Sequence, residues 1–105
     1  MSAVDINNNN FHDEVLNSSK PVLLDFWSPR CGPCRAVLPI VDEIAGENPH
    51  IKVAKVNVEE QPELAMEFKI RSIPTLMVME NGEIKNKSIG AKNKASILSM
   101  LKSIA

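Results

Sequence analysis

The chain has no marked excess of charge of either sign, no long apolar run and only two cysteines. Its 105 residues include 12 Lys and Arg against 13 Asp and Glu, which gives a formal net charge of −1. Nucleic-acid-binding proteins need clustered positive charge to displace counterions, so this class is disfavoured. No apolar stretch is long enough to span a bilayer, so we expect no membrane association.

The N-terminal residues also lack the marks of an export signal. Met1 to Asp5 carry neither a basic start nor an apolar stretch, so we expect a cytoplasmic location. A longer precursor would leave the same mature sequence, and that alternative stays open. Internal repeats and linkers are absent, and a chain of 105 residues with 44% hydrophobic content is sufficient for one domain spanning residues 1–105. We expect this domain to be a monomer.

Both cysteines, Cys31 and Cys34, fall within one four-residue segment and are separated by Gly and Pro. A disulfide across so small a ring restrains the unfolded chain by about 1.9 kcal/mol, against about 4.7 kcal/mol for a 100-residue loop. A disulfide between them would therefore add little stability as a structural cross-link. The spacing is well suited to a disulfide that forms and breaks reversibly, because each sulfur stays within reach of the other. Redox activity is the leading interpretation. A structural disulfide and half of a zinc site are the alternatives, but His12 and His50 are isolated and we expect no metal.

The spacing of apolar residues predicts strands that alternate with helices. Strands are expected at residues 4–6, 21–27, 51–58, 75–79 and 84–88. The second of these is a nearly continuous apolar run, which is typical of a central strand covered on both faces. Asn81-Gly82, between the last two strands, tolerates the positive φ angles of a type I′ turn and predicts a hairpin.

Four helices are expected between and after these strands. Asn9 or Asn10 is the expected cap of the first, Pro62 begins the third and Asn93 caps the last. Pro39 lies inside the second, where we expect a kink. The order βαβαβαββα predicts an α/β fold with one mixed sheet and helices on both faces. The apolar residues that mark these helices are Phe11, Val15, Leu16, Cys34, Val37, Leu38, Val41, Ile44, Ala45, Leu64, Ala65, Phe68, Ile97, Leu98, Leu101 and Ile104.

Several short segments along the chain form a characteristic set: Leu24-Asp25-Phe26-Trp27, Cys31-Gly32-Pro33-Cys34-Arg35, Pro39, Lys55-Val56-Asn57, Ile70-Arg71-Ser72-Ile73-Pro74-Thr75, Asn81-Gly82 and Gly90. Together they resemble the thioredoxin family. A lone Cys-x-x-Cys is a weak signal, but Cys-Gly-Pro-Cys after Asp-Phe-Trp, with Ile-Pro-Thr about 40 residues later, is specific. The resemblance implies the thioredoxin fold, a central mixed sheet flanked by four helices. It also implies dithiol–disulfide exchange with protein substrates.

The two cysteines have different expected roles. Cys31 should lie at the start of the second helix, where unpaired N–H groups and the helix dipole favour a thiolate, and Arg30 and Arg35 add positive charge. Cys31 is therefore the expected nucleophile toward a substrate disulfide, and Cys34, one turn further on, is the expected resolving cysteine. A thioredoxin reductase would recharge the pair. No bound cofactor is implied beyond the redox-active disulfide Cys31–Cys34.

Asp25 is a carboxylate inside an apolar strand, where burial should raise its pKa. The resemblance assigns Asp25 as the buried acid that exchanges a proton with Cys34. It also assigns Lys55 as the lysine near that acid. The alternative is an aspartate at a strand end whose carboxylate caps a neighbouring group.

The resemblance also implies a groove for an extended substrate strand beside the cysteines. Pro74 should follow a cis bond, so that the backbone of Ile73 can pair with the substrate, and glycine lets another backbone come close. An ordinary trans proline at Pro74 and a purely core role for Trp27 are the alternatives. The expected groove residues are Trp27, Arg30, Gly32, Pro33, Ser72, Ile73, Pro74, Gly90 and Ala91.

Arg30 is a departure from the family, whose members commonly carry Trp immediately before the first cysteine. Two effects compete here: the charge favours the Cys31 thiolate, while the loss of aromatic surface weakens docking of partners, including the reductase. A tolerated surface change is the alternative.

Two other functions compete with that of a protein-disulfide reductase. An oxidant or isomerase is disfavoured by the Gly-Pro pair between the cysteines and by the missing export signal. A thioredoxin-fold subunit that binds and stabilises a partner protein without turnover is the second alternative.

Overall fold

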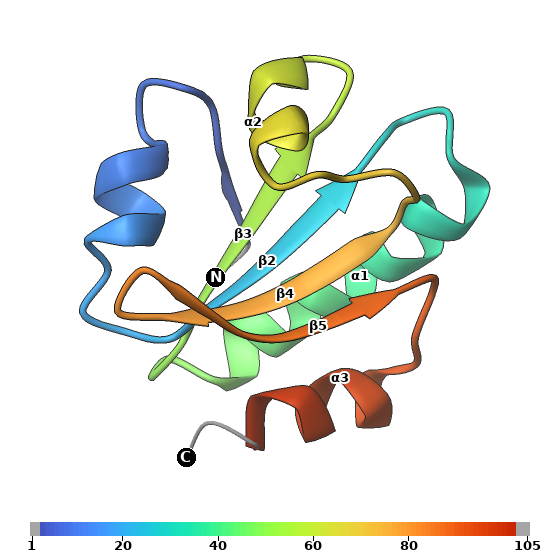
Figure 1. Cartoon of the computed structure of the whole chain (residues 1–105). Coiled ribbons are helices and arrows are strands. Elements are labelled where there is room, and N and C mark those ends of the chain that lie inside the picture. Colours follow the sequence, from blue (N-terminus) through green and yellow to red (C-terminus); the bar gives the residue numbers. More distant parts are fainter. Residues whose placement is uncertain (1–2, 103–105) are drawn as a thin grey trace.

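The computed structural model describes residues 3–102, and its elements follow the order that the sequence predicts (Figure 1). The strands are β1 (Val4–Asp5), β2 (Val22–Trp27), β3 (Lys52–Asn57), β4 (Thr75–Glu80) and β5 (Glu83–Ile89). The helices are the π-helix η1 (His12–Leu16), α1 (Gly32–Glu47), α2 (Pro62–Glu67) and α3 (Lys94–Lys102). The predicted order βαβαβαββα is therefore confirmed. None of the helices within residues 3–102 is long and apolar enough to cross a membrane.

The strands form one mixed sheet in the order β1-β3-β2-β4-β5. Strand β3 runs parallel to β1 and β2, whereas β4 runs antiparallel to β2 and β5. Residues 22–26 of β2 are all buried, as expected for a central strand covered on both faces. Strand β5 lies at an edge of the sheet and is mostly exposed, including Lys85 and Lys87. Exposed lysines on an edge strand disfavour its pairing with a strand of another molecule.

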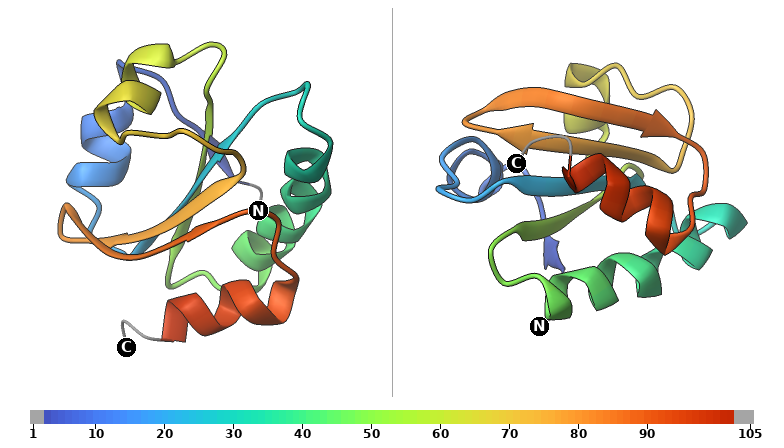
Figure 2. Two further views of the ribbon diagram at one scale, coloured as in Figure 1. Left: turned by 45° about the vertical axis from the view of Figure 1, so that its right-hand side comes forward. Right: turned by 90° about the horizontal axis from the view of Figure 1, so that it is seen from below.

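Helices cover both faces of the sheet, with α1 and α3 on one face and η1 and α2 on the other (Figure 2). Successive side chains along β2 point to opposite faces and so enter different cores. Leu23 packs in the core with Val41 of α1 and Ile97 of α3. Phe26 packs in the other core with Phe11, next to η1. The sheet therefore separates two apolar layers, each closed by a pair of helices.

The strand boundaries differ slightly from the predicted ones. Ile6 lies just beyond β1, although its N–H still donates to the Lys55 carbonyl at 2.8 Å. Ile51 and Val58, the predicted ends of the third strand, lie just outside β3. The hairpin strands extend one residue closer to the turn than predicted. The ladder hydrogen bonds set these limits, and a run of apolar residues does not mark where the ladder stops.

Two turn and cap predictions are confirmed. Asn81 and Gly82 have φ angles of 54° and 78°, and a type I′ turn requires positive values at both positions. The side-chain oxygen of Asn93 accepts the N–H of Ser96 at 2.9 Å, as expected for the cap of α3.

The predicted cap of the first helix is wrong. The Oδ1 atom of Asn7, not of Asn9 or Asn10, accepts the N–H groups of Asn9 at 2.8 Å and Asn10 at 3.0 Å. These bonds lie in the turn at residues 8–10, and η1 itself has Phe11 as its N-cap residue with no side-chain cap.

The apolar stripe of α1 lies as predicted, with Cys34, Val37, Val41 and Ile44 buried. Leu38 and Ala45 are half-buried at its margins, and Pro39 is exposed within the helix. In α3 Ile97 is buried and Leu98 and Leu101 pack half-buried against the same core, as predicted, whereas the burial of Met100 was not predicted. The predicted contact of Ile104 lies outside the described residues. The kink at Pro39 stays a prediction.

The cap of α3 provides a test of the fold. Replacing Asn93 by Ala removes the acceptor for the Ser96 N–H, so the free energy of unfolding should fall by about 1 kcal/mol. Asn93→Ser keeps a capping oxygen and should lose much less. Urea denaturation of both variants measures the difference, and equal losses would show that the hydrogen bond contributes nothing.

Candidate active site

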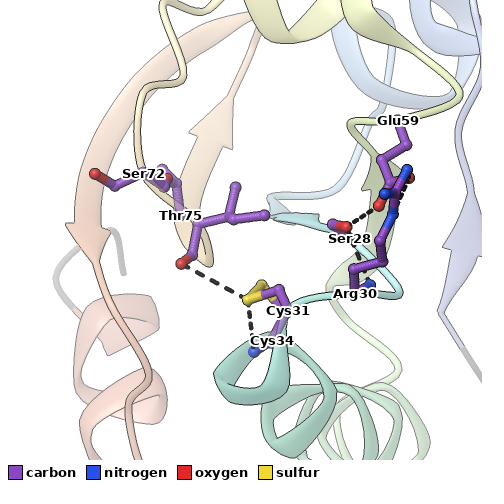
Figure 3. Close-up of a disulfide and its surroundings, with 8 residues drawn as sticks. Ser28, Arg30, Cys31, Cys34, Glu59, Ser72 and Thr75 are labelled. Atoms are coloured by element: carbon purple, nitrogen blue, oxygen red, sulfur yellow. Dashed lines mark hydrogen bonds and ion pairs between the residues drawn. A yellow bond between two sulfur atoms is a disulfide. The ribbon is translucent and has the colours of Figure 1, made fainter.

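Cys31 and Cys34 form a disulfide at the start of α1, with Cα atoms 5.2 Å apart (Figure 3). Cys31 is the N-cap residue, and its Sγ accepts the N–H of Cys34 at 3.2 Å. Pro33 in the first turn fits this position, because an N–H there would have no partner within the helix. Cys31 is half-buried, whereas Cys34 is fully buried. Of the pair, Cys31 is therefore the sulfur that another molecule can reach.

The segment from Ser72 to Thr75 lies beside this sulfur. The carbonyl oxygen of Ile73 is 3.9 Å from Cys31 Sγ, and the Ile73–Pro74 bond is cis, as the family resemblance implies. The hydroxyl of Thr75 donates to the Ser72 carbonyl at 2.6 Å and closes the loop. The structure thus brings Ile73 and Pro74, far from the cysteines in sequence, next to the disulfide.

The remaining groove residues lie on the segments that meet here. The N–H of Gly90 donates to the Pro74 carbonyl at 2.8 Å, so the end of β5 is tied to the loop. Gly90 has a φ angle of 96°, which favours glycine, and a Cβ atom at either Gly90 or Gly32 would meet no other atom within 4 Å. Ala91 is exposed. Trp27 is half-buried, and its Nε1 is buried with no hydrogen-bond partner among the described residues.

Asp25 is fully buried in β2, on the same side of the strand as Leu23 and therefore on the face that α1 covers. Loss of hydration by burial raises the pKa of Asp25 from its ordinary value of 3.8 to about 7. Neither carboxylate oxygen has a hydrogen-bond partner within residues 3–102. The carboxyl caps nothing there, and it is able to hold or release a proton near neutral pH.

Lys55 stands opposite Asp25 in the register of β2 and β3. It also stands opposite Asp5 of β1, and its Nζ lies 3.8 Å from Asp5 Oδ1. Its positive charge lowers the pKa of Asp25, but by less than burial raises it. The position of Asp5 was not predicted, because only the parallel pairing of β1 with β3 places it beside this lysine.

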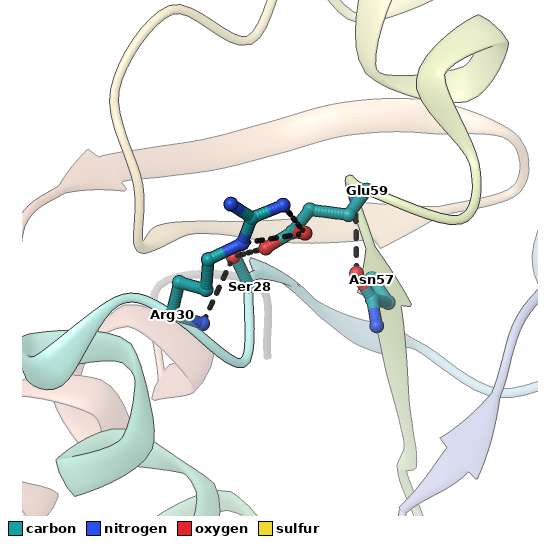
Figure 4. Close-up of polar contacts among 4 residues, drawn as sticks. All are labelled: Ser28, Arg30, Asn57 and Glu59. Atoms are coloured by element: carbon teal, nitrogen blue, oxygen red, sulfur yellow. Dashed lines mark hydrogen bonds and ion pairs between the residues drawn. The ribbon is translucent and has the colours of Figure 1, made fainter.

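Arg30 is exposed, and its guanidinium pairs with Glu59 (Figure 4). The Nε and Nη2 atoms of Arg30 donate to Glu59 Oε1 at 3.1 and 2.8 Å. Glu59 Oε2 accepts a hydrogen bond from the Ser28 hydroxyl. The same hydroxyl oxygen accepts a hydrogen bond from the backbone N–H of Arg30 at 3.2 Å. Hydrogen bonds from Ser28 and then from Arg30 lower the pKa of Glu59. The cluster holds the turn before Cys31, whose N–H donates to the Ser28 carbonyl at 3.1 Å.

This cluster changes the effect expected of Arg30. The carboxylate of Glu59 offsets the guanidinium charge, so we attribute less stabilisation of a Cys31 thiolate to Arg30 than the sequence alone predicts. Sequence reasoning missed Ser28 and Glu59 because no local pattern links residues 31 positions apart. The parallel register that ends with Trp27 opposite Asn57 brings the two together.

Comparison with known proteins decides the family. The sequence profile described as Thioredoxin matches residues 2–103. A thioredoxin of Pyropia yezoensis is 49% identical over 102 residues, which are 96% of this chain and 95% of that protein. Thioredoxin 1 of Nostoc sp. is 47% identical over 97 residues, 91% of each chain. The "Thioredoxin M-type, chloroplastic" of Chlamydomonas reinhardtii is 51% identical over 94 residues, 89% of this chain and 67% of that one.

The chain belongs to the thioredoxin family. Its mixed sheet and four described helices are the thioredoxin fold that the resemblance implied, so the predicted fold class is confirmed. As a thioredoxin-family protein with a close Cys31–Cys34 pair, it is a thiol–disulfide oxidoreductase that acts on proteins. Its partners, at the level of the family, are disulfide-containing proteins and a reductase. Within residues 3–102, no group of three or more His, Cys, Asp or Glu is placed to hold a metal ion.

The raised pKa of Asp25 predicts how stability depends on pH. Between its ordinary value of 3.8 and about 7, the folded protein holds a proton that the unfolded chain has lost. Stability therefore falls as the pH rises through this window, by about 4 kcal/mol in total. Asp25→Ala removes this loss, so the variant should be more stable than the parent at pH 8 and should lose that advantage at pH 4.

Urea denaturation of the oxidised proteins at the two pH values measures this difference. Asp13→Ala is the matched control, because Asp13 has an exposed side chain. A stability difference for Asp25→Ala that does not change with pH would contradict the raised pKa.

Proposed function

We propose that the protein reduces disulfides in protein substrates through a mixed disulfide on Cys31, and that a thioredoxin reductase then restores the dithiol. The unequal exposure of the two sulfurs supports this proposal most directly. Cys31 is half-buried at the start of α1, and Cys34 is fully buried behind it. Since a substrate can reach only the first sulfur, the order of attack follows from access.

In the first step, the Cys31 thiolate attacks one sulfur of the substrate disulfide. The start of α1 favours a negative charge on Cys31, and the Cys34 N–H already points at its Sγ. The substrate S–S bond breaks as the new bond to Cys31 forms. One substrate cysteine leaves as a thiolate, and the other stays bound in the mixed disulfide.

In the second step, Cys34 loses its proton and attacks Cys31 Sγ. The mixed disulfide breaks, the second substrate cysteine leaves as a thiolate, and the Cys31–Cys34 bond forms, so the substrate gains two electrons in all. We assign Asp25 as the acceptor of the Cys34 proton, because it faces α1 and its pKa is about 7. Lys55, opposite Asp25, limits the rise of that pKa.

We propose that the substrate docks as an extended segment along the backbone of Ile73, next to the attacked sulfur. Arg30 lies on the other side of the disulfide from Ser72 and Thr75 (Figure 3), so it would contact a different part of the substrate. The remaining residues assigned to this groove are Trp27, Gly32, Pro33, Ser72, Pro74, Gly90 and Ala91.

We also propose a cytoplasmic location, because a dithiol that must be regenerated in each cycle needs a reducing compartment. The printed name of the Chlamydomonas relative places that protein in the chloroplast. Fractionation of the source cells tests the assignment, and recovery of the protein in an organelle would contradict it.

A trap of the mixed disulfide tests the proposed reaction. Cys34→Ser should complete the first step and stall, so a protein substrate stays covalently bound to Cys31. Non-reducing electrophoresis and mass spectrometry detect the complex, and Cys31→Ser is the control that should capture nothing. Full turnover by Cys34→Ser would contradict the two-step scheme. Partner binding without any turnover by the unaltered protein would favour the alternative role of a stabilising subunit.

Arg30 provides a test of partner docking. Arg30→Trp replaces the paired guanidinium with a rigid aromatic surface, and we expect kcat/KM with a thioredoxin reductase to rise several-fold. Arg30→Gln is the control, because it removes the charge without adding aromatic surface and should give no such gain. Equal rates for Arg30→Trp and the parent protein would contradict the assignment of this position to docking.

A further inference from the structure

A cleft next to the loop before β4 is lined by positive charge. Its volume is about 310 Å³. Three of its seven lining residues are Lys or Arg and none is Asp or Glu, in a chain whose net charge is −1. The positive charge is therefore a local feature of this surface. The lining residues are Lys69, Ile70, Arg71, Ser72, Thr75, Lys87 and Ile89.

The cations come from two segments that the fold brings together. Lys87 of β5 is paired with Met77 of β4, so the two side chains lie on the same face of the sheet. Met77 packs in the core beneath η1 and α2. Lys87 therefore projects on the side of α2, and the chain that leaves α2 carries Lys69 and Arg71 along that side.

These three cations are exposed and make no ion pair within the part of the chain that the structure describes. Ile89, in the same cleft, is 56% exposed and adds apolar surface. Other basic side chains are engaged with carboxylates, namely Arg30, Lys52, Lys55, Lys85 and Lys94. The charges in the cleft are thus available to a ligand.

The cleft and the disulfide share one loop. Ser72 and Thr75 line the cleft, while the Ile73 carbonyl between them lies 3.9 Å from Cys31 Sγ. The Ser72 side chain points away from the disulfide in Figure 3. A substrate segment that docks on Ile73 and continues past this loop reaches the cleft. An extended chain advances about 3.3 Å per residue, and we assign to the cleft the side chains roughly two to four positions from the attacked cysteine.

We propose that this cleft binds acidic side chains of the protein substrate, two to four residues from the cysteine that Cys31 attacks. The inference rests on the proposed docking of a substrate segment at Ile73. An acidic segment fits because its carboxylates complement the unpaired cations and an aliphatic neighbour can cover Ile89. Pairs of exposed charges act mainly on association rate and on selectivity. The cleft therefore selects among substrates and leaves the exchange reaction unchanged.

Peptides with one intramolecular disulfide test this selectivity. Two versions carry Glu or Gln at the positions two to four residues from each cysteine and are otherwise identical. At low ionic strength, kcat/KM should be about three- to tenfold higher for the Glu peptide, and the ratio should fall toward one at high salt.

Two matched double variants test whether the preference for the Glu peptide arises in the cleft. Arg71→Gln/Lys87→Gln should lose at least half of the preference for the Glu peptide and reduce the Gln peptide at the unaltered rate. Lys20→Gln/Lys102→Gln changes the net charge by the same amount outside the cleft and should keep the preference.

Results other than these expected ones contradict the proposal. Equal kcat/KM for the two peptides would overturn the cleft proposal and leave the proposed reductase function intact. An equal loss of preference in both double variants would have the same meaning. Inhibition by inorganic phosphate without a preference for the Glu peptide would assign the cleft to a small anion. If neither peptide is reduced, the proposed function itself fails, and the substrate cleft fails with it.

Discussion

The hydrogen bond from the Cys34 N–H to Cys31 Sγ joins the more accessible sulfur to the start of α1. Helix α1 begins shortly after β2 and crosses to the parallel strand β3, which lays it over the face of the sheet that holds Asp25. Burial of Val37 and Val41 against that face fixes the rotation of the helix, and Cys34 lies one turn earlier on the same stripe. The exposure of one sulfur and the burial of the other thus follow from helix packing.

Asp25 shows that the core here is not built for stability alone. The carboxyl lies fully buried without a hydrogen-bond partner among the described residues, so its ionisation opposes folding. An apolar side chain at this position would pack without that cost. A destabilising acid on the face that α1 covers fits the proposed transfer of the Cys34 proton near neutral pH.

Local patterns predicted most of the architecture, because they report local causes. The apolar run of β2, the Asn81-Gly82 turn and the Asn93 cap each depend on residues close in sequence. The turn held by Asn7 was missed because the sequence alone does not distinguish among four consecutive asparagines. The pairing of Arg30 with Glu59 was missed because it depends on the register of two strands. The groove around the disulfide was inferred from family resemblance, since neither composition nor spacing places the Ile73 loop beside Cys31.

Strand β5 has a further consequence for behaviour in solution. It lies at the edge of the sheet, and Lys85 and Lys87 are exposed along it. A second copy that paired antiparallel with this edge in the register that sets Lys85 opposite Lys87 would bring like charges together, and like charges directly opposite on adjacent strands repel. Lys87 thus serves two purposes, because the charge that lines the cleft also hinders the growth of intermolecular sheets when the protein is concentrated or crowded.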